Sequence, residues 1–239
     1  MGATQRVRNT VHYYNIINGK FARKVTEDTI GAVKRQTQDK TTKEIKDVYE
    51  LLYDDIDGFI YNVEFVTNTF RNLAVSSWKI TVTDVKEGEP VMVIMLPDGS
   101  SEAADFLSKL PNVDFEKPVL LSPSIAAKKN KDGKVIENKF TRHLWIKQGD
   151  KYENEIGSYF YNTATKSYIN GFPVIGITNP DSDDWKSYFI TVKKFLKRFF
   201  MENILPKLEE GGTKDDNFNA NEYESHTEVT ENEEPDLPF

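Results

Sequence analysis

The 239-residue chain contains no cysteine, only three histidines and no long apolar run. Without cysteine there are no disulfides, no thiolate zinc sites and no cysteine nucleophile, which is typical of proteins from a reducing compartment. No apolar stretch approaches the roughly 18 residues of a membrane span. Residues 1–24 also lack the apolar segment of a secretory signal. These absences predict a cytoplasmic protein with no membrane partner.

Enzyme signatures are equally scarce. None of the histidines, at positions 12, 143 and 226, has a partner at metal-ligand spacing, and neither a phosphate-cradling glycine loop nor a nucleophile elbow occurs. The acids of Asp181-Ser182-Asp183-Asp184 are better explained by helix capping than by a metal site. Asp54-Asp55-Ile56-Asp57-Gly58 lacks the closing glutamate of a calcium loop, so we expect a turn. The sequence therefore predicts no catalytic residue, metal or cofactor.

Acidic residues are concentrated at one end of the chain. Residues 209–239 hold 11 of the 38 acids and one of the 31 basic residues, so residues 1–208 keep 27 acids and 30 basic residues, a net charge of +3. The acidic segment has too few apolar side chains to form a core and repels itself. We therefore expect one mildly basic domain over 1–208 and a disordered acidic tail over 209–239.

Strand patterns dominate the domain. Val7–Ile17 and Lys20–Val25 flank Asn18-Gly19, the dipeptide that favours a type I′ hairpin turn. A second hairpin is predicted where Val119–Ala127 and Val135–Gln148 flank a lysine-rich loop. Further strands and a third hairpin are expected at Phe59–Thr67, Val75–Val85, Val91–Leu96 and Ser158–Asn170.

Three helices are expected among these strands. One covers Ser100–Leu110, and a long one begins after Asp181 or Ser182 and reaches about Leu208, with Trp185, Phe189, Val192, Leu196 and Phe199 on one face. A polar, aperiodic excursion from Thr26 leads to Thr41-Thr42-Lys43-Glu44, which matches a capping box. Because Ile45, Val48, Tyr49 and Leu52 follow at helical spacing, a short helix to about Tyr53 is predicted.

Many short strands with few helices predict a mainly β fold. Among closed β folds we favour an oligonucleotide-binding barrel with insertions and an appended C-terminal helix of about residues 182–208, followed by the tail.

The strand Val135–Gln148 carries the strongest candidate site. Alternate residues separate into an apolar face, in which Arg142 is the exception, and a face with Lys139, Thr141, His143, Trp145 and Lys147. An indole between cations suits single-stranded nucleic acid, because the ring stacks on a base and the cations meet phosphates. The adjoining loop adds Lys128, Lys129, Lys131 and Lys134.

The first hairpin has a similar pattern and supplies a second candidate edge. Its candidate contacts are Arg6, Arg8 and Tyr14 on the first strand and Lys20 and Arg23 on the second. The competing interpretation is that these side chains form an ordinary solvated face, with the two aromatic rings, Tyr14 and Trp145, covering the margin of the core. For each strand alone the two interpretations have about equal weight.

Other aromatic residues are weaker candidates. Trp78 alternates with Ile80 and Val82, and Trp185 belongs to the apolar helix stripe, so both are expected in the core. Tyr159, Tyr161, Tyr168 and Phe172 suit either stacking or packing. Phe195 and Phe200 fall outside the helix stripe, which indicates either a homodimer contact or deeper burial.

The last residues, Asp236-Leu237-Pro238-Phe239, resemble the C-terminal tip of bacterial and phage single-stranded DNA-binding proteins, in which an acidic disordered tail closes with the form Asp-x-Pro-Phe. The resemblance covers only this tip and the charge layout. The bacterial core is much shorter than 208 residues, so a phage replisome type is the better match. This chain departs from the phage proteins that carry a zinc site, because it has no cysteine. The resemblance implies that Phe239 docks on replication and repair proteins and that the tail competes with DNA for the basic core.

The leading hypothesis is therefore a single-stranded DNA-binding protein of replication, recombination and repair, in the host cytoplasm if phage-encoded. Its partners would be single-stranded DNA and, through the tip, a polymerase, helicase, primase or nuclease. The alternative is an interaction adaptor whose tail captures a partner and whose domain binds no nucleic acid. A DNA enzyme such as a nuclease is the least supported.

Overall fold

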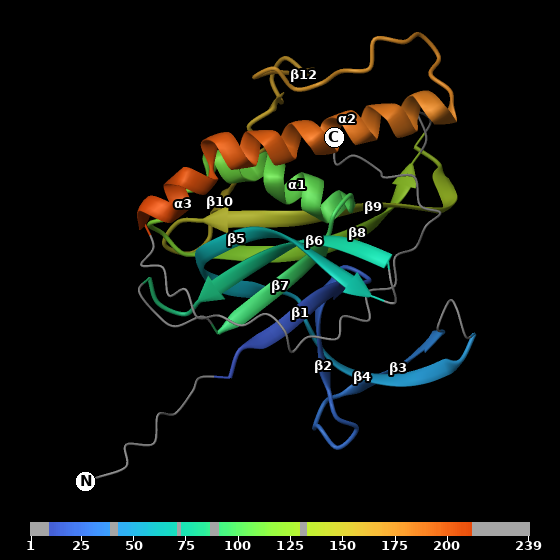
Figure 1. The fold of residues 1–239 in the computed structure, drawn as a ribbon, viewed down its shortest axis with the longest axis vertical. Coiled ribbons are helices and arrows are strands. Elements are labelled where there is room, and N and C mark those ends of the chain that lie inside the picture. Colours follow the sequence, from blue (N-terminus) through green and yellow to red (C-terminus); the bar gives the residue numbers. More distant parts are fainter. Residues whose placement is uncertain (1–9, 39–42, 71–72, 87–90, 130–132, 212–239) are drawn as a thin grey trace.

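The computed structural model describes residues 10–38, 43–70, 73–86, 91–129 and 133–211 of the chain. They form one large mixed sheet with a layer of helices against it (Figure 1). The strands are β1 (His12–Ile17), β2 (Lys20–Val25), β3 (Val33–Gln38), β4 (Ile45–Tyr53), β5 (Ile56–Phe70), β6 (Leu73–Thr83), β7 (Met92–Pro97), β8 (Val119–Lys129), β9 (Val135–Gln148), β10 (Asn154–Glu155), β11 (Tyr161–Asn162) and β12 (Ser167–Tyr168). The helices are α1 (Ser101–Lys109), the 3₁₀ turn η1 (Leu110–Asn112), α2 (Ser182–Asn203) and α3 (Leu205–Gly211). The fold is therefore mainly β, as predicted.

The first hairpin forms where the sequence predicts it. Asn18 and Gly19 both have positive φ, 50° and 71°, as a type I′ turn requires. The turn joins β1 to β2 in antiparallel register, with Ile16 opposite Phe21. On its other side β1 runs parallel to β7, with Tyr14 opposite Ile94.

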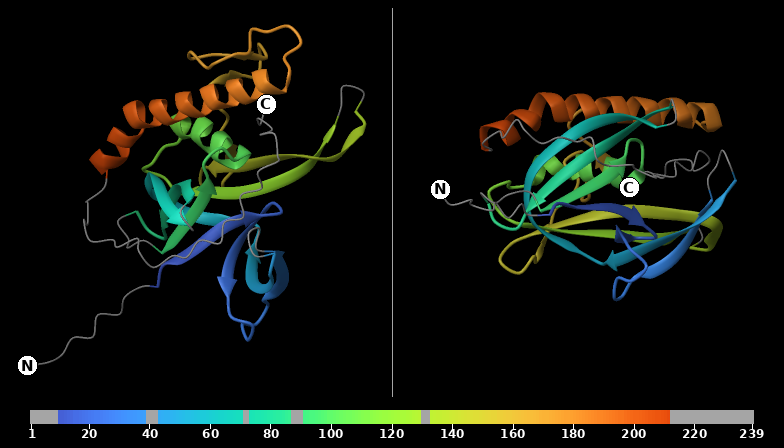
Figure 2. Two further views of the ribbon diagram at one scale, coloured as in Figure 1. Left: turned by 45° about the vertical axis from the view of Figure 1, so that its right-hand side comes forward. Right: turned by 60° about the horizontal axis from the view of Figure 1, so that its bottom comes forward.

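Strands β5, β6, β7 and β8 form a Greek key. The first three are successive antiparallel neighbours, and the chain then passes through α1 and returns as β8 to pair with β5. The resulting order, β8-β5-β6-β7, is that of a Greek key. Strand β9 extends this sheet beyond β8, and the β8–β9 hairpin projects from the body of the molecule (Figure 2).

The expected closed barrel is not formed by hydrogen bonds among the described strands, because the strand order has free ends at β10 and β3. The sheet nevertheless curls until its first hairpin touches β8. A Cβ atom added to Gly19 would lie 2.9 Å from both Cγ2 and the amide nitrogen of Ile125. The β1–β2 turn therefore packs directly on β8 without pairing with it.

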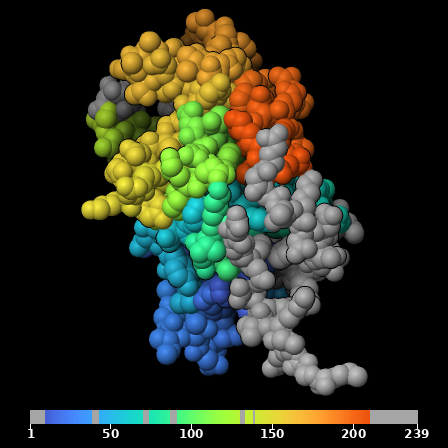
Figure 3. Space-filling view, turned by 90° about the vertical axis from the view of Figure 1, so that its left-hand side faces the viewer, coloured from blue at the N-terminus to red at the C-terminus, as the bar shows by residue number. Residues whose placement is uncertain are grey.

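Two segments differ from their predictions. Residues 33–38, expected within a polar excursion, form strand β3. Residues 45–53 form strand β4, not a helix, and pair with β2 on one side and β3 on the other. Part of the expected capping box, Thr41-Thr42, lies outside the described residues. The pairing places Phe21 opposite Tyr53, and it overrides the helical spacing of the apolar residues. In the space-filling view, this arm of first strands (blue) lies at the opposite end of the molecule from the helical layer (Figure 3).

The inner face of the sheet is the one that packs in the core. The paired residues Val63, Ile80 and Ile94 define it in the middle of the sheet, and Leu121 and Ile146 define it on β8 and β9; all five are fully buried. Because side chains alternate along each strand, neighbouring residues point to the other side, the outer face.

Helix α2 begins as the sequence predicts, at Asp181. Its carboxylate accepts hydrogen bonds from the amides of Asp183 and Asp184, at 2.8 and 2.9 Å, in a full capping box. The acids of this segment therefore cap a helix. α2 ends at Asn203, and α3 continues after a break.

The aromatic residues of the second half of the chain are mostly packed together. Phe200 is buried against Trp78, with ring centroids 5.0 Å apart, so it is a core residue. Phe195 packs on Phe160 and Phe172, which favours burial of this side chain over a dimer contact. Trp78 is in the core as predicted, whereas Trp185 is 37% exposed, contrary to prediction.

Candidate nucleic-acid interface

Strand β9 shows the alternation expected from its sequence. Leu144 and Ile146 point to the inner face and are fully buried, while His143 and Trp145 point to the outer face and are half-buried. On β8, Ser124 lies opposite His143 and Ser122 opposite Trp145. The outer face of the hairpin therefore carries the two rings among polar side chains, together with the apolar Leu120 and Ala126 of β8.

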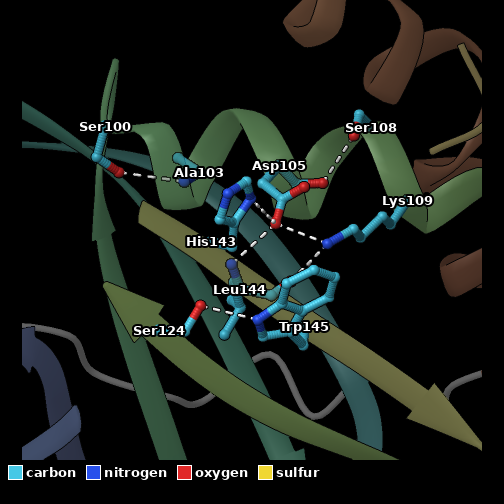
Figure 4. Close-up of polar contacts among 9 residues, drawn as sticks. All are labelled: Ser100, Ala103, Asp105, Ser108, Lys109, Ser124, His143, Leu144 and Trp145. Atoms are coloured by element: carbon cyan, nitrogen blue, oxygen red, sulfur yellow. Dashed lines mark hydrogen bonds and ion pairs between the residues drawn. The ribbon is translucent and has the colours of Figure 1, made fainter. Parts of the chain in front are cut away.

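Trp145 is held in place by three neighbours (Figure 4). Its Nε1 donates a hydrogen bond of 2.8 Å to Oγ of Ser124. The ring of His143 stacks on it, with centroids 5.3 Å apart and planes 30° apart. Nζ of Lys109, from α1, lies 4.8 Å from the indole centroid, a cation–π contact. Much of the indole is thus engaged within the protein, and the remaining exposed part has a fixed orientation.

Helix α1 also supports β9 through a buried ion pair. Oδ2 of Asp105 accepts hydrogen bonds from Nζ of Lys109 at 2.6 Å and from the amide of Leu144 at 2.9 Å. Lys109 in turn donates to the carbonyl of Leu144 at 3.1 Å. The amide and the carbonyl of Leu144 both point away from β8. The residue opposite Leu144 on β8 is Pro123. Asp105 and Lys109 therefore replace the missing neighbouring strand at this edge.

The protonation of this cluster follows from its burial. Burial raises the pKa of the Asp105 carboxyl, although Lys109 and the Leu144 amide oppose the shift. Burial also lowers the pKa of His143, and Lys109 adds to this effect while Asp105, with its Oδ2 3.8 Å from Nδ1, opposes it. At neutral pH His143 is therefore an uncharged ring, and it supplies stacking rather than a positive charge.

The predicted cations are spread along the two strands of the β8–β9 hairpin. Lys139 and Lys147 share the outer face with Trp145, whereas Arg142 is on the inner face, opposite Ile125. Lys129, Lys134 and Lys139 are exposed, and Lys128, Arg142 and Lys147 are half-buried. Lys131 lies outside the described residues.

The predicted residues of the first hairpin occupy a different surface. Tyr14 is only 6% exposed, and its ring packs on Tyr53 with centroids 5.6 Å apart. Arg23 lies beside Tyr53, with Cζ 6.0 Å from the ring centroid. Lys20 forms an exposed ion pair with Asp54, at 2.7 Å. Little of the Tyr14 ring is therefore open to a ligand.

The strand register separates the two candidate edges. Ile16 and Phe21 are paired, so Tyr14 and Arg23, two residues away from each, share their inner face. Trp145 follows the inner-face residue Leu144 and is therefore on the outer face. The structure places Trp145, His143, Lys139 and Lys147 on one face of β9 but does not join them to the Tyr14–Arg23 pair. Arg6, Arg8 and the tip Asp236–Phe239 lie outside the described residues.

Asp105 and Lys109 were not predicted as site residues from the sequence. They are four residues apart on a helix, which is a signal for an ordinary ion pair, and nothing in their spacing indicates contact with β9. Their position against Trp145 depends on the packing of α1 on β9.

No family model, curated protein or solved structure matches this chain. Among the described residues no helix is long and apolar enough to cross a membrane. Within the same residues no group of three or more histidine, aspartate or glutamate side chains is placed to hold a metal ion.

Proposed function

We propose that this protein binds single-stranded DNA without strong sequence preference in replication, recombination and repair. The topology supports the proposal. The Greek key β8-β5-β6-β7 with β9 added makes five strands in the chain order β5, β6, β7, β8, β9, with a helix before the fourth. An oligonucleotide-binding fold is a partly open, five-stranded Greek-key barrel, and the loop between its fourth and fifth strands is one of its binding loops.

The observation that carries the proposal is the position of the basic hairpin in this order. The β8–β9 loop corresponds to the binding loop between strands four and five. From residue 128 to residue 147 the described residues include one acid, Glu137, and six basic residues: Lys128, Lys129, Lys134, Lys139, Arg142 and Lys147. Such a density of cations attracts a polyanion, and their positions along both strands suit a phosphate backbone.

Trp145 gives this basic surface a stacking group. Because its indole is fixed by Ser124 and His143, a base that stacks on the exposed part loses little free energy to ordering of the side chain. Every base has an aromatic face, so stacking tolerates any sequence. Lys139 and Lys147, on the same face, would meet the phosphates on either side.

The acidic segment completes the proposed function. Residues 209–239 carry the charge of a competing polyanion and are tethered to the basic domain, which raises their effective concentration at the DNA site. Leu237, Pro238 and Phe239 follow these acids and would recruit replication proteins.

The test measures binding of the full chain to fluorescent oligo-dT by anisotropy over a series of salt concentrations. Replacing Lys128, Lys129 and Lys134 by alanine should weaken binding and reduce the slope of log K against log salt by about 2, since each single-strand phosphate contact contributes about 0.7. The matched control replaces Lys34, Lys46 and Lys117, which form exposed pairs with acids outside the β8–β9 hairpin.

Three results would reject the proposal. They are an absence of binding to oligo-dT at low salt, equal affinity for duplex and single strand, and equal effects of the two triple substitutions. Absence of binding by a folded protein would favour the adaptor hypothesis.

A further inference from the structure

A pocket of about 350 Å³ lies between α1 and α2 and has no residue of β9 in its lining. Trp78, Ala104 and Leu107 line one side of it, and Phe189, Val192 and Leu196 of α2 line the other. Nearly all of its accessible lining is apolar. A volume of this size is enough for one aromatic side chain and an aliphatic neighbour.

The rim of the pocket is apolar as well. Ile190, which lines the pocket, is 53% exposed, and Trp185, which stacks on Phe189 with centroids 5.8 Å apart, is 37% exposed. An exposed apolar rim around a recessed apolar pocket is typical of a docking site for an apolar segment.

The charge around the pocket restricts the occupant. Between Trp185 and Met201, α2 carries five basic residues and no acid; they are Lys186, Lys193, Lys194, Lys197 and Arg198. Two of these, Lys186 and Lys193, line the pocket itself, and Lys186 also pairs with Asp183 at the start of α2. One acid is present there, Asp98, whose carboxylate lies 2.6 Å from Nζ of Lys193. A complementary segment is acidic and ends in apolar side chains.

We infer that this pocket receives the chain's own residues Asp236–Phe239, with Phe239 and Leu237 in the apolar recess and the preceding acids along the basic side of α2. The segment after Gly211 is 28 residues long. At about 3.3 Å per residue it reaches at most about 90 Å. α2 has 22 residues, or about 33 Å, so the pocket is within reach from the end of α3.

This docking goes beyond the proposed function and does not depend on DNA binding. It covers the pocket in the isolated protein, and a partner protein has to compete with α1 and α2 for the apolar tip. The tip would then be released by an interaction at a surface separate from the β8–β9 hairpin.

Disulfide trapping tests the contact without DNA, because the natural chain has no cysteine. The full chain is made with Pro235→Cys, which leaves the tip intact, and with Ile190→Cys at the pocket rim. The control pairs Pro235→Cys with Thr191→Cys, the next residue of α2, which is exposed and does not line the pocket. Docking should make the intrachain disulfide form at least about tenfold faster in the Ile190 pair, because it raises the effective concentration of the two thiols.

The outcomes separate the occupants of the pocket. Adding Phe239→Ala to the Ile190 pair should reduce the rate to that of the Thr191 pair. Equal rates in the two pairs, or a rate that does not respond to Phe239→Ala, would overturn the inference. Interchain disulfides as the main product in dilute solution would overturn it too, since the occupant would then be a second copy.

Discussion

The carboxylate of Asp105, on α1, accepts a hydrogen bond of 2.9 Å from the backbone amide of Leu144, on β9. Lys109 donates to both Asp105 and the Leu144 carbonyl. Asp105, Lys109 and the backbone of Leu144 therefore satisfy one another's hydrogen-bonding groups inside the protein. The side chains of Asp105 and Lys109 are only 3% and 6% exposed. The edge of β9 and the orientation of Trp145 thus depend on a buried ion pair.

Replacing Asp105 by asparagine should therefore destabilise the fold. The variant leaves the Lys109 charge buried without its carboxylate, and breaking a buried pair in this way costs about 3–5 kcal/mol. Urea unfolding measures the loss. The control is Asp183→Asn, which breaks an exposed pair with Lys186 and should change stability little. A double variant, Asp105→Leu with Lys109→Met, should lose less stability than the single substitution. Equal effects of Asp105→Asn and Asp183→Asn would contradict this account.

His143 should make the protein less stable in acid. Its pKa is lowered in the folded state by burial, so the unfolded state binds a proton more readily. This contribution to stability is complete above the unfolded pKa of about 6.5 and is lost as the pH falls below it. Between about pH 7.5 and pH 5, a His143→Gln variant should lose less unfolding free energy than the natural protein. The pKa of His12 is lowered as well, but this residue remains in both proteins. Identical pH profiles would show that His143 does not contribute.

Gly19 should tolerate alanine poorly, for two reasons. Its φ is 71°, and an added Cβ would meet the backbone and side chain of Ile125 on β8. Gly133 has a similar φ of 77° with nothing within 4 Å of a Cβ, so Gly133→Ala measures the cost of the backbone conformation alone. That cost is about 1 kcal/mol, and Gly19→Ala should exceed it clearly in thermal unfolding. Equal losses would show that the β1–β2 turn does not depend on its contact with β8.

Local patterns predicted those parts of the fold that local interactions decide. Asn18-Gly19 predicted the first turn through its positive φ angles, and Asp181 predicted the start of α2 through its own hydrogen bonds. Residues 45–53 were predicted wrongly because their apolar spacing suits a helix. Their partners, β2 and β3, satisfy the backbone as a strand, and a short window of sequence does not contain them.

The candidate site was predicted in part for the same reason. Alternation placed Trp145 and His143 on one face and Leu144 on the other, because a strand fixes that period. The contact of Lys109 with the indole joins residues 36 positions apart through the packing of α1, and no pattern indicates it. The placement of Tyr14 and Trp145 on opposite faces depends on the register of every intervening strand.

Trp145→Ala should weaken binding of oligo-dT by about 1–3 kcal/mol, the usual worth of one base stacked on an aromatic ring. Trp145→Phe should keep part of this affinity, although it loses the hydrogen bond to Ser124. Fluorescence anisotropy measures binding, and circular dichroism checks that the fold is intact. The matched control is Tyr49→Ala, which removes a half-buried ring from β4 and should leave the affinity unchanged. If Trp145→Ala and Trp145→Phe both bind like the natural protein, Trp145 is not a stacking group.

Neutralising acids in the tail should tighten binding to single-stranded DNA. Changing Asp215, Asp216, Glu222 and Glu224 to their amides removes four charges from the proposed competitor while the chain keeps its length and its tip. The gain in affinity should be largest at low salt and should fade as salt rises. Salt screens the attraction of the basic domain for the tail as well as its attraction for DNA. The control changes four exposed acids of the domain, Asp28, Glu44, Asp183 and Glu202, and so alters the net charge equally. A larger gain from the tail variant indicates local competition at the basic hairpin, whereas equal gains would mean that net charge alone acts and that the tail does not occupy the DNA site.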